Sequence, residues 1–203
     1  NLLDIVLAAS ERNWRLFMLR KADKRFGKFQ EKVFTDDGYT CRYCGFASKK
    51  HMSVVNIDGN YTNNKRSNMA TCCQLCLQCF FIESVGQSDF GGGSLILLPE
   101  ISQSQLNAMG HYLFAQMALS TSELSSAKNV YRSLKLRSQL IEKQLGEGMS
   151  NPALYGRVLV ETESPEAKDL HKELVQHVRL LPAVEKFSNQ IQQWVLAAIK
   201  TME

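Results

Sequence analysis

The sequence predicts an α+β protein built from two regions of different character. All six cysteines of the 203-residue chain lie between Cys41 and Cys79, in a stretch that also contains short runs typical of strands. From residue 101 onward, apolar residues recur at the three- and four-residue spacing of amphipathic helices. We therefore expect a small cysteine-stapled module with an N-terminal extension over residues 1–100. A multi-helix region over residues 101–203 is expected to pack on it as one compact unit.

Composition indicates a globular protein of the cytoplasm. A hydrophobic content of 44% supplies enough apolar material for a buried core. The net charge of +4 is too small to indicate nucleic acid or an anionic membrane as the partner. No apolar run approaches the roughly 18 residues of a membrane span. Residues 2–7 contain an acid and lack the basic lead and cleavage site of a secretory signal. Clustered cysteines without an export signal indicate a protein of the reducing cytosol.

The N-terminal part is predicted to contain a strand followed by a helix. Residues 13–19 are rich in aromatic and aliphatic types and predict a strand. Residues 20–32 are basic and carry apolar residues at helical spacing. Their positive charges suit a phosphate, but Asp23 and Glu31 dilute the charge and favour an ordinary solvated helix face.

Two further strands are predicted in the first region. Residues 53–57 form a short β-branched run between turn signals. Residues 94–98 form an apolar run that ends at Pro99, typical of a buried strand. The glycines at 91–93 precede it without the strand-to-helix setting and following lysine of a phosphate-binding loop, so they predict a flexible joint.

Four helices are predicted in the second region. Ser102 and Gln105 form a capping box at the start of the first helix, and Pro165 occupies the first position of the third. Glycines at 146 and 148 end the second helix, and Pro182 follows the third. The apolar stripes predict helices over residues 102–117, 122–145, 164–181 and 184–198.

The cysteines are spaced as metal ligands rather than as a disulfide framework. A framework would spread its cysteines along the chain, whereas here Cys-x-x-Cys pairs lie about thirty residues apart. A tetrahedral zinc ion takes four thiolate or imidazole ligands, and each such pair supplies two of them. Cys41 and Cys44 are therefore expected ligands of one structural zinc ion (Zn²⁺).

The spacing leaves the second ligand pair open. Residues 72–79, which read CCQLCLQC, contain the motif both as Cys73/Cys76 and as Cys76/Cys79, with Cys72 alongside. Four ligands leave two cysteines over. Because free cysteine is among the most buried residue types, these two are expected in the core rather than at a second metal.

Two segments resemble the zinc-stapled ββα frame of the HNH endonucleases. They are residues 33–45, VFTDDGYTCRYCG, and residues 68–76, NMATCCQLC. In that frame an asparagine lies five residues before the first downstream ligand. The resemblance therefore selects Cys73 and Cys76, and it implies a zinc site made of Cys41, Cys44, Cys73 and Cys76.

The catalytic pair of those nucleases is missing. The family places an Asp-His pair on the strand between the two ligand pairs, where histidine activates water and the acid helps to hold a divalent ion. These positions fall at Val55 and Asn56, neither of which accepts a proton near pH 7. His51 and Asp58 lie nearby without the required adjacency, so we interpret them as a surface histidine and a turn aspartate. We expect no enzyme and no catalytic residue.

A resemblance to the IcmJ/DotN family of the Dot/Icm type IVB secretion system covers nearly the whole chain. It is carried, in order, by NYTNN at 60–64, CFFIESVG at 79–86, GGG at 91–93 and YRS at 131–133, together with the paired cysteines. The resemblance implies a non-catalytic adaptor subunit of the coupling complex that helps to recruit effector proteins for export. It implies binding to the C-terminal tail of the coupling ATPase DotL, in an assembly with DotM, IcmS, IcmW and LvgA. Membrane association would be indirect, at the inner membrane through these partners.

Two other functions compete with this one. The HNH-like spacing and the basic residues on two helices suit a metal-dependent nuclease or a nucleic-acid-binding module, but the missing Asp-His pair and the weak net charge oppose both. A redox switch would need an exposed thiolate of low pKa in a thioredoxin-like setting, which the sequence lacks. We therefore expect no nucleic acid as a partner.

Overall fold

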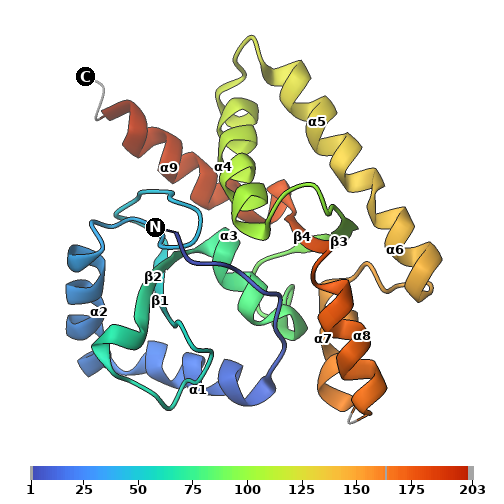
Figure 1. Cartoon of the computed structure of the whole chain (residues 1–203). Coiled ribbons are helices and arrows are strands. Elements are labelled where there is room, and N and C mark those ends of the chain that lie inside the picture. Colours follow the sequence, from blue (N-terminus) through green and yellow to red (C-terminus); the bar gives the residue numbers. More distant parts are fainter. Residues whose placement is uncertain (1, 163, 201–203) are drawn as a thin grey trace.

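A computed structural model describes residues 2–162 and 164–200, except for the side chain of residue 167 (Figure 1). The helices are α1 (Glu11–Ala22), α2 (Lys24–Asp36), α3 (Gln74–Leu77), α4 (Gln103–Leu119), α5 (Leu124–Leu136), α6 (Ser138–Leu145), α7 (Pro152–Glu161), α8 (Pro165–Leu174) and α9 (Ser188–Lys200). The strands are β1 (Met52–Asn56), β2 (Met69–Cys73), β3 (Gly93–Leu97) and β4 (Val178–Pro182). This mixture of helices with two small antiparallel sheets confirms the α+β class.

The first sheet and α3 form the ββα unit that the HNH resemblance implies. Strand β1 pairs antiparallel with β2, with Val54 opposite Thr71, and β2 passes directly into α3. The predicted strand over residues 53–57 is thus confirmed within one residue. Helix α2 packs on this sheet through Val33 and Phe34, while the basic residues along its outer side stay exposed. The module therefore presents Cys73 and Cys76 where a strand ends and a helix begins.

Residues 13–19 are helical, and the predicted strand there is wrong. Ser10 caps α1, because its hydroxyl accepts a hydrogen bond from the Asn13 backbone N–H at 3.3 Å. The apolar side chains that looked like a strand lie one helical turn apart: Trp14 stacks on Phe17 at 5.8 Å between ring centroids, and both contact Phe81. A spacing of three positions places Trp14 and Phe17 on the face of a helix that lies on an aromatic core, while Met18 and Leu19 stay exposed.

The second sheet joins the middle of the chain to its last part. Strand β3 pairs antiparallel with β4, with Leu95 opposite Leu180. The predicted helix over residues 164–181 is therefore correct at its start and wrong at its end, because α8 stops at Leu174. All residues of Val178–Pro182 except Arg179 are buried, and the segment pairs with β3, whose central residues Leu95 and Ile96 are buried.

The glycines at 91–93 are packed rather than flexible. A Cβ at Gly93 would lie 2.3 Å from the Leu181 carbonyl oxygen, so only glycine allows β4 to pair here. The Gly92 backbone N–H donates a 2.9 Å hydrogen bond to the buried Gln78 side chain. Glycine is thus required for close approach of the backbones, which corrects the expectation of a flexible joint.

The helical region follows the sequence in part. The capping box of α4 is confirmed, since Ser102 and Gln105 exchange side-chain hydrogen bonds. The helix expected over residues 122–145 is divided at Arg137 into α5 and α6, and the Arg137 guanidinium donates hydrogen bonds to the Leu97 carbonyl and to Glu100. Helix α7, which Asn151 caps, was not predicted. The helix expected over residues 184–198 is a 3₁₀ turn that continues as α9.

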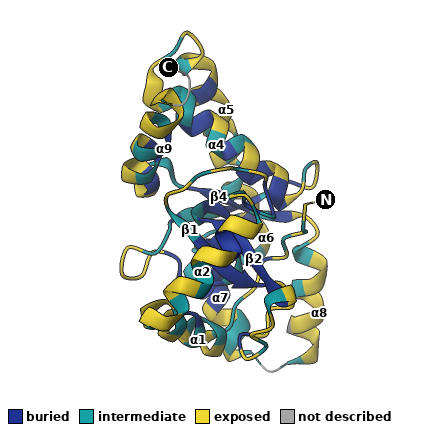
Figure 2. Ribbon diagram, turned by 90° about the vertical axis from the view of Figure 1, so that its left-hand side faces the viewer, coloured by how far each residue is buried: buried dark blue, intermediate teal, exposed yellow. Residues whose placement is uncertain are grey.

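The largest hydrophobic cluster draws on both halves of the chain. It combines Phe17 and Phe81 with Phe114 of α4 and Trp194 of α9. In Figure 2 buried residues run through the sheets at the centre, while the outer faces of the helices are exposed. The boundary expected near residue 100 stays a prediction, although β3 and β4 pair across it.

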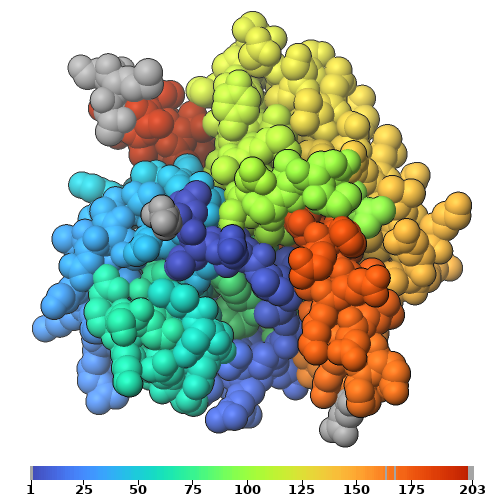
Figure 3. Space-filling view, viewed as in Figure 1, coloured from blue at the N-terminus to red at the C-terminus, as the bar shows by residue number. Residues whose placement is uncertain are grey.

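The N-terminal segment lies across the surface between the two regions, as Figure 3 shows. Its backbone is fixed by hydrogen bonds from Leu3 to the Arg42 carbonyl at 2.7 Å and from Ala8 to the Cys79 carbonyl at 3.0 Å. Among residues 2–162 and 164–200, no helix combines the length and apolar character that crossing a bilayer requires.

Candidate metal centre

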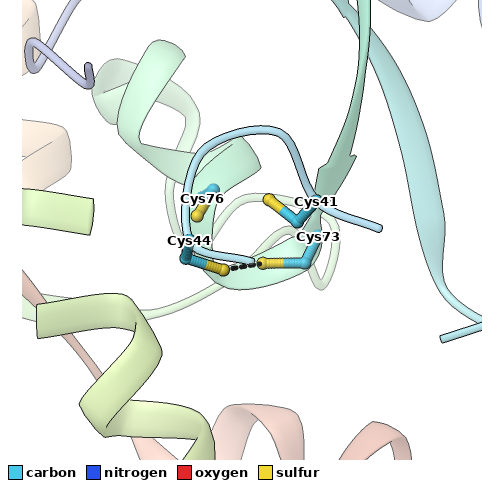
Figure 4. Close-up of side chains that lie close together, drawn as sticks. All are labelled: Cys41, Cys44, Cys73 and Cys76. Atoms are coloured by element: carbon cyan, nitrogen blue, oxygen red, sulfur yellow. Dashed lines mark hydrogen bonds between the residues drawn. The ribbon is translucent and has the colours of Figure 1, made fainter. Parts of the chain in front are cut away.

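Four cysteines from two turns point toward one another (Figure 4). Cys41 and Cys44 lie in a tight loop after α2, in which the Gly45 N–H donates to the Cys41 carbonyl at 3.0 Å. Gly45 has a φ of +79°, a conformation that favours glycine at this reversal. Cys73 ends β2 and Cys76 lies in α3. A hydrogen bond of 2.9 Å from the Arg42 N–H to the Thr71 carbonyl holds the loop beside β2.

The sulfur positions fit a tetrahedral metal ion. The Sγ atoms of Cys41, Cys44, Cys73 and Cys76 all lie within 4.8 Å of one another, and those of Cys44 and Cys73 are 3.6 Å apart. Bonds of about 2.3 Å from zinc to sulfur would place the sulfurs of a tetrahedron about 3.8 Å apart. All four residues are buried. Four thiolates in a closed site suit zinc in a structural role, because a catalytic site keeps one position open.

The pKa values of the clustered thiols favour binding of a cation. Burial raises the pKa of the Cys73 and Cys76 thiols well above the usual range. Hydrogen bonds from neighbouring thiols, that of Cys44 first, hold the pKa of Cys41 well below it. The buried sulfurs therefore cannot all ionise alone, whereas a divalent cation would stabilise four thiolates and release their protons.

The other two cysteines lie outside this group. The Cys72 thiol donates to the Cys73 carbonyl at 3.4 Å, and the Cys79 thiol donates to the Leu75 carbonyl at 3.5 Å. Both residues are fully buried, and burial raises the pKa of Cys79 to about 12. The structure thus gathers the four cysteines that the HNH resemblance selects and leaves the other two as packed thiols. That the four bind a metal stays a prediction.

The two residues at the positions of the nuclease pair, Val55 and Asn56, have structural roles. Val55 is buried in the core. The Asn56 side chain accepts a hydrogen bond from Arg20 and donates to the carbonyls of Asn60 and Asn63, both at 2.9 Å. Asn56 therefore closes the loop between β1 and β2, where a nuclease would hold its base.

His51 and Asp58 do not replace that pair. They lie beyond opposite ends of the five-residue strand β1, which at about 3.3 Å per residue separates them by roughly 16 Å. Asp58 accepts hydrogen bonds from Asn63 and Asn68, which makes it the turn aspartate expected. His51 is half-buried rather than a free surface residue, because its Nε2 lies 3.0 Å from the Gln193 amide oxygen of α9.

Two polar residues of α4 approach the sulfurs and were missed in the sequence. The Asn107 Nδ2 lies 3.3 Å from the Cys76 sulfur, and the His111 Nε2 lies 3.3 Å from the Cys73 sulfur. Burial lowers the pKa of His111 to about 4, so its ring is neutral at pH 7. The sequence signal that could have indicated them is their spacing. Two polar residues four positions apart, beside the apolar stripe of a predicted helix, lie on one face of that helix.

The comparisons with known proteins agree with the resemblance. No protein-family model matches the chain. The "Type 4 apparatus protein DotN" of Legionella pneumophila is 44% identical over 197 residues, which cover 97% of this chain and 92% of that protein. Identity at this level along nearly all of both sequences means that this chain belongs to the IcmJ/DotN family of the Dot/Icm type IVB secretion system.

Proposed function

We propose that the chain is a non-catalytic, zinc-binding adaptor subunit of the type IVB coupling complex. The observation that carries this proposal is the 44% identity, over 97% of the chain, to a protein named as a type 4 apparatus component. The buried group of four cysteines supports a metal with an architectural purpose. Structural zinc contributes apparent binding energies on the order of 10 kcal/mol, comparable with the stability of a whole domain.

The proposed partners are those that the family resemblance implies, and no surface feature of the molecule is used to select them. The adaptor binds the C-terminal tail of the coupling ATPase DotL and works in an assembly with DotM, IcmS, IcmW and LvgA. Its task is to help recruit effector proteins for export. It resides in the cytoplasm and reaches the inner membrane only through these partners.

A nuclease or nucleic-acid-binding function is the weaker alternative. Asn56 and Val55 stand where the catalytic pair would be, and Asn56 is held by Arg20 and two backbone carbonyls. The purified protein should leave plasmid DNA intact in magnesium or manganese. Cleavage that is lost in Asp58→Asn or His51→Ala would reverse the ranking.

Co-purification with the tail of DotL tests the adaptor function. The protein and the tagged tail are co-expressed, and a tail of scrambled sequence is the control. We expect a stoichiometric complex with the native tail and none with the scrambled one. Cys41→Ser is expected to lose solubility or tail binding, because one missing ligand unfolds the module. The proposal fails if the folded, zinc-loaded protein ignores the native tail, or if a zinc-free Cys41→Ser variant folds and binds it normally.

A further inference from the structure

Two side-chain nitrogens of α4 face the sulfur cluster from the side of the helical region. Asn107 is fully buried, and its Nδ2 reaches the Cys76 sulfur at 3.3 Å, the Leu75 carbonyl at 3.3 Å and the Cys79 sulfur at 3.7 Å. His111, one helical turn further on, has its Nε2 3.3 Å from the Cys73 sulfur. Both contacts reach cysteines of the second ligand pair.

The orientation of the Asn107 side-chain amide is set by hydrogen bonds that begin at the backbone of β4. The Leu180 backbone N–H donates to the Gln103 Oε1 at 2.8 Å, which orients that amide. The Gln103 Nε2 then donates to the Asn107 Oδ1 at 3.0 Å. Since its oxygen is occupied, Asn107 presents its NH₂ group to the sulfurs. The backbone of β4 thereby orients the Asn107 NH₂ group toward the sulfur cluster.

The His111 ring is fixed by packing. It stacks on Phe46, with centroids 3.6 Å apart and planes inclined by 4°, and it contacts Trp194 of α9 at 4.9 Å. Its Nδ1 is buried and has no hydrogen-bond partner among the described residues. A neutral imidazole carries one N–H, and a proton on Nε2 gives that N–H the Cys73 sulfur as acceptor. A proton on Nδ1 would leave that N–H buried without an acceptor among the described residues, so the Nε2 tautomer, which donates toward the cluster, is favoured.

We propose that Asn107 and His111 are positioning residues of the metal centre, each donating an N–H hydrogen bond to a metal-bound thiolate. A zinc ion with four thiolates carries an excess of two negative charges, and burying that charge is costly unless donors compensate it. Charge-assisted N–H donors lower this cost and fix the sulfurs in place. Metal binding is thereby coupled to the docking of α4 and, through Gln103, to β4. The inference rests on the zinc content proposed above.

Three variants of the full-length protein test it. His111→Phe keeps the stack on Phe46 and removes the N–H donor, while Asn107→Leu removes the amide at similar volume. His171→Phe is the matched control, because its Nδ1 lies 2.9 Å from the Tyr155 hydroxyl and no hydrogen bond to a cysteine is found for it among the described residues. Zinc affinity is measured by competition with a chelator. The cobalt-substituted proteins give the energy of the sulfur-to-metal charge-transfer band and the identity of the ligands.

We expect His111→Phe and Asn107→Leu each to weaken zinc binding about 10- to 100-fold and His171→Phe to leave it unchanged. The charge-transfer band should move to lower energy in the first two, because their thiolate lone pairs lose a hydrogen bond; a merely structural defect would not move it. If Asn107→Leu does not fold, His111→Phe decides. Wild-type affinity and spectra in the foldable variants would overturn the inference, as would a cobalt site of three sulfurs and one nitrogen. A wild-type protein that binds no metal would overturn the proposed zinc content as well.

Discussion

Glu83 is a carboxyl group in the interior without a charged partner. It is 3% exposed, and neither oxygen has a hydrogen-bond partner among residues 2–162 and 164–200. Burial raises its pKa above the ordinary value of 4.5. A carboxyl whose folded pKa is raised stabilises the fold at low pH, and that contribution is lost as pH rises toward the folded pKa.

We predict that Glu83→Gln is more stable than the wild type at pH 8 and that its advantage shrinks toward pH 4. The substituted amide would keep the shape of the side chain and remove the ionisable group. Denaturant unfolding at several pH values measures the difference in free energy of unfolding. Acid also releases metal from thiolates, but both proteins share that effect, so it cancels in the difference. A stability advantage of Glu83→Gln that is constant with pH would show that ionisation of the buried Glu83 carboxyl does not destabilise the fold.

The candidate metal site shows which residues a sequence can reveal. Cys41 and Cys44 follow from spacing alone, because two ligands in one short turn form a local pattern. Cys73 and Cys76 needed the HNH resemblance, since the run at 72–79 offers two pairs of equal spacing. Asn107 and His111 approach the sulfurs because α4 packs on α3. Their four-residue spacing places them on one face of α4, but it does not indicate which part of the chain that face contacts.

At the scale of elements, Arg20 ties α1 to β1. Its guanidinium donates to the Asn56 side chain and, at 2.7 Å, to the Val54 carbonyl. The same group lies over the rings of Phe26 at 4.7 Å and Tyr61 at 5.1 Å. One side chain thus connects α1, α2, β1 and the loop that closes the sheet.

We predict that Arg20→Met lowers the free energy of unfolding by about 2–3 kcal/mol, because two hydrogen bonds and the cation–π contacts are lost together. Denaturant melts measure this. Arg25→Met is the control: its side chain is 92% exposed in a surface ion pair, and its loss should leave stability unchanged. Equal melts for both variants would refute the connecting role of Arg20.

Gly156 lets α7 pack on the turn at residues 82–84. A Cβ at this position would lie 2.5 Å from the Glu83 backbone nitrogen and 2.7 Å from its Cα. We predict that Gly156→Ala destabilises the protein by about 2–3 kcal/mol, because neither backbone can move away. Gly27→Ala in α2 is the matched control, since a Cβ there meets nothing within 4 Å. That substitution should stabilise the protein by about 0.5–1 kcal/mol. Thermal or denaturant unfolding compares the two, and a stabilised Gly156→Ala variant would contradict the predicted contact.

Elements were predictable where local signals were complete. The capping box at Ser102 and the proline at the start of α8 mark helix starts within a few residues of sequence. The predictions for residues 13–19 and 178–182 were wrong because a short apolar run is compatible with both a helix and a strand. Tertiary contacts decide between the two. The first run lies on an aromatic cluster as a helix, and the second pairs with β3 more than eighty residues away.

At the scale of the whole molecule, the sulfur cluster lies between parts that are distant in sequence. Its four cysteines come from residues 41–76. From the helical region, His111 of α4 contacts the Cys73 sulfur, and Trp194 of α9 packs against the His111 ring. The sheet of β3 and β4 joins the same two regions. The α+β class could be predicted from patterns along the chain, whereas this long-range assembly could not, because it depends on pairings that no local signal records.

The metal content of the purified protein tests the central claim most directly. The protein is prepared under reducing conditions and weighed by native mass spectrometry, and its thiols are counted after unfolding in chelator. We predict one zinc ion per chain and six free thiols, with the metal lost when Cys41 or Cys44 is replaced by serine. A folded chain without metal, a chain with two metals, or cysteines oxidised to disulfides would contradict a single structural zinc at these four sulfurs.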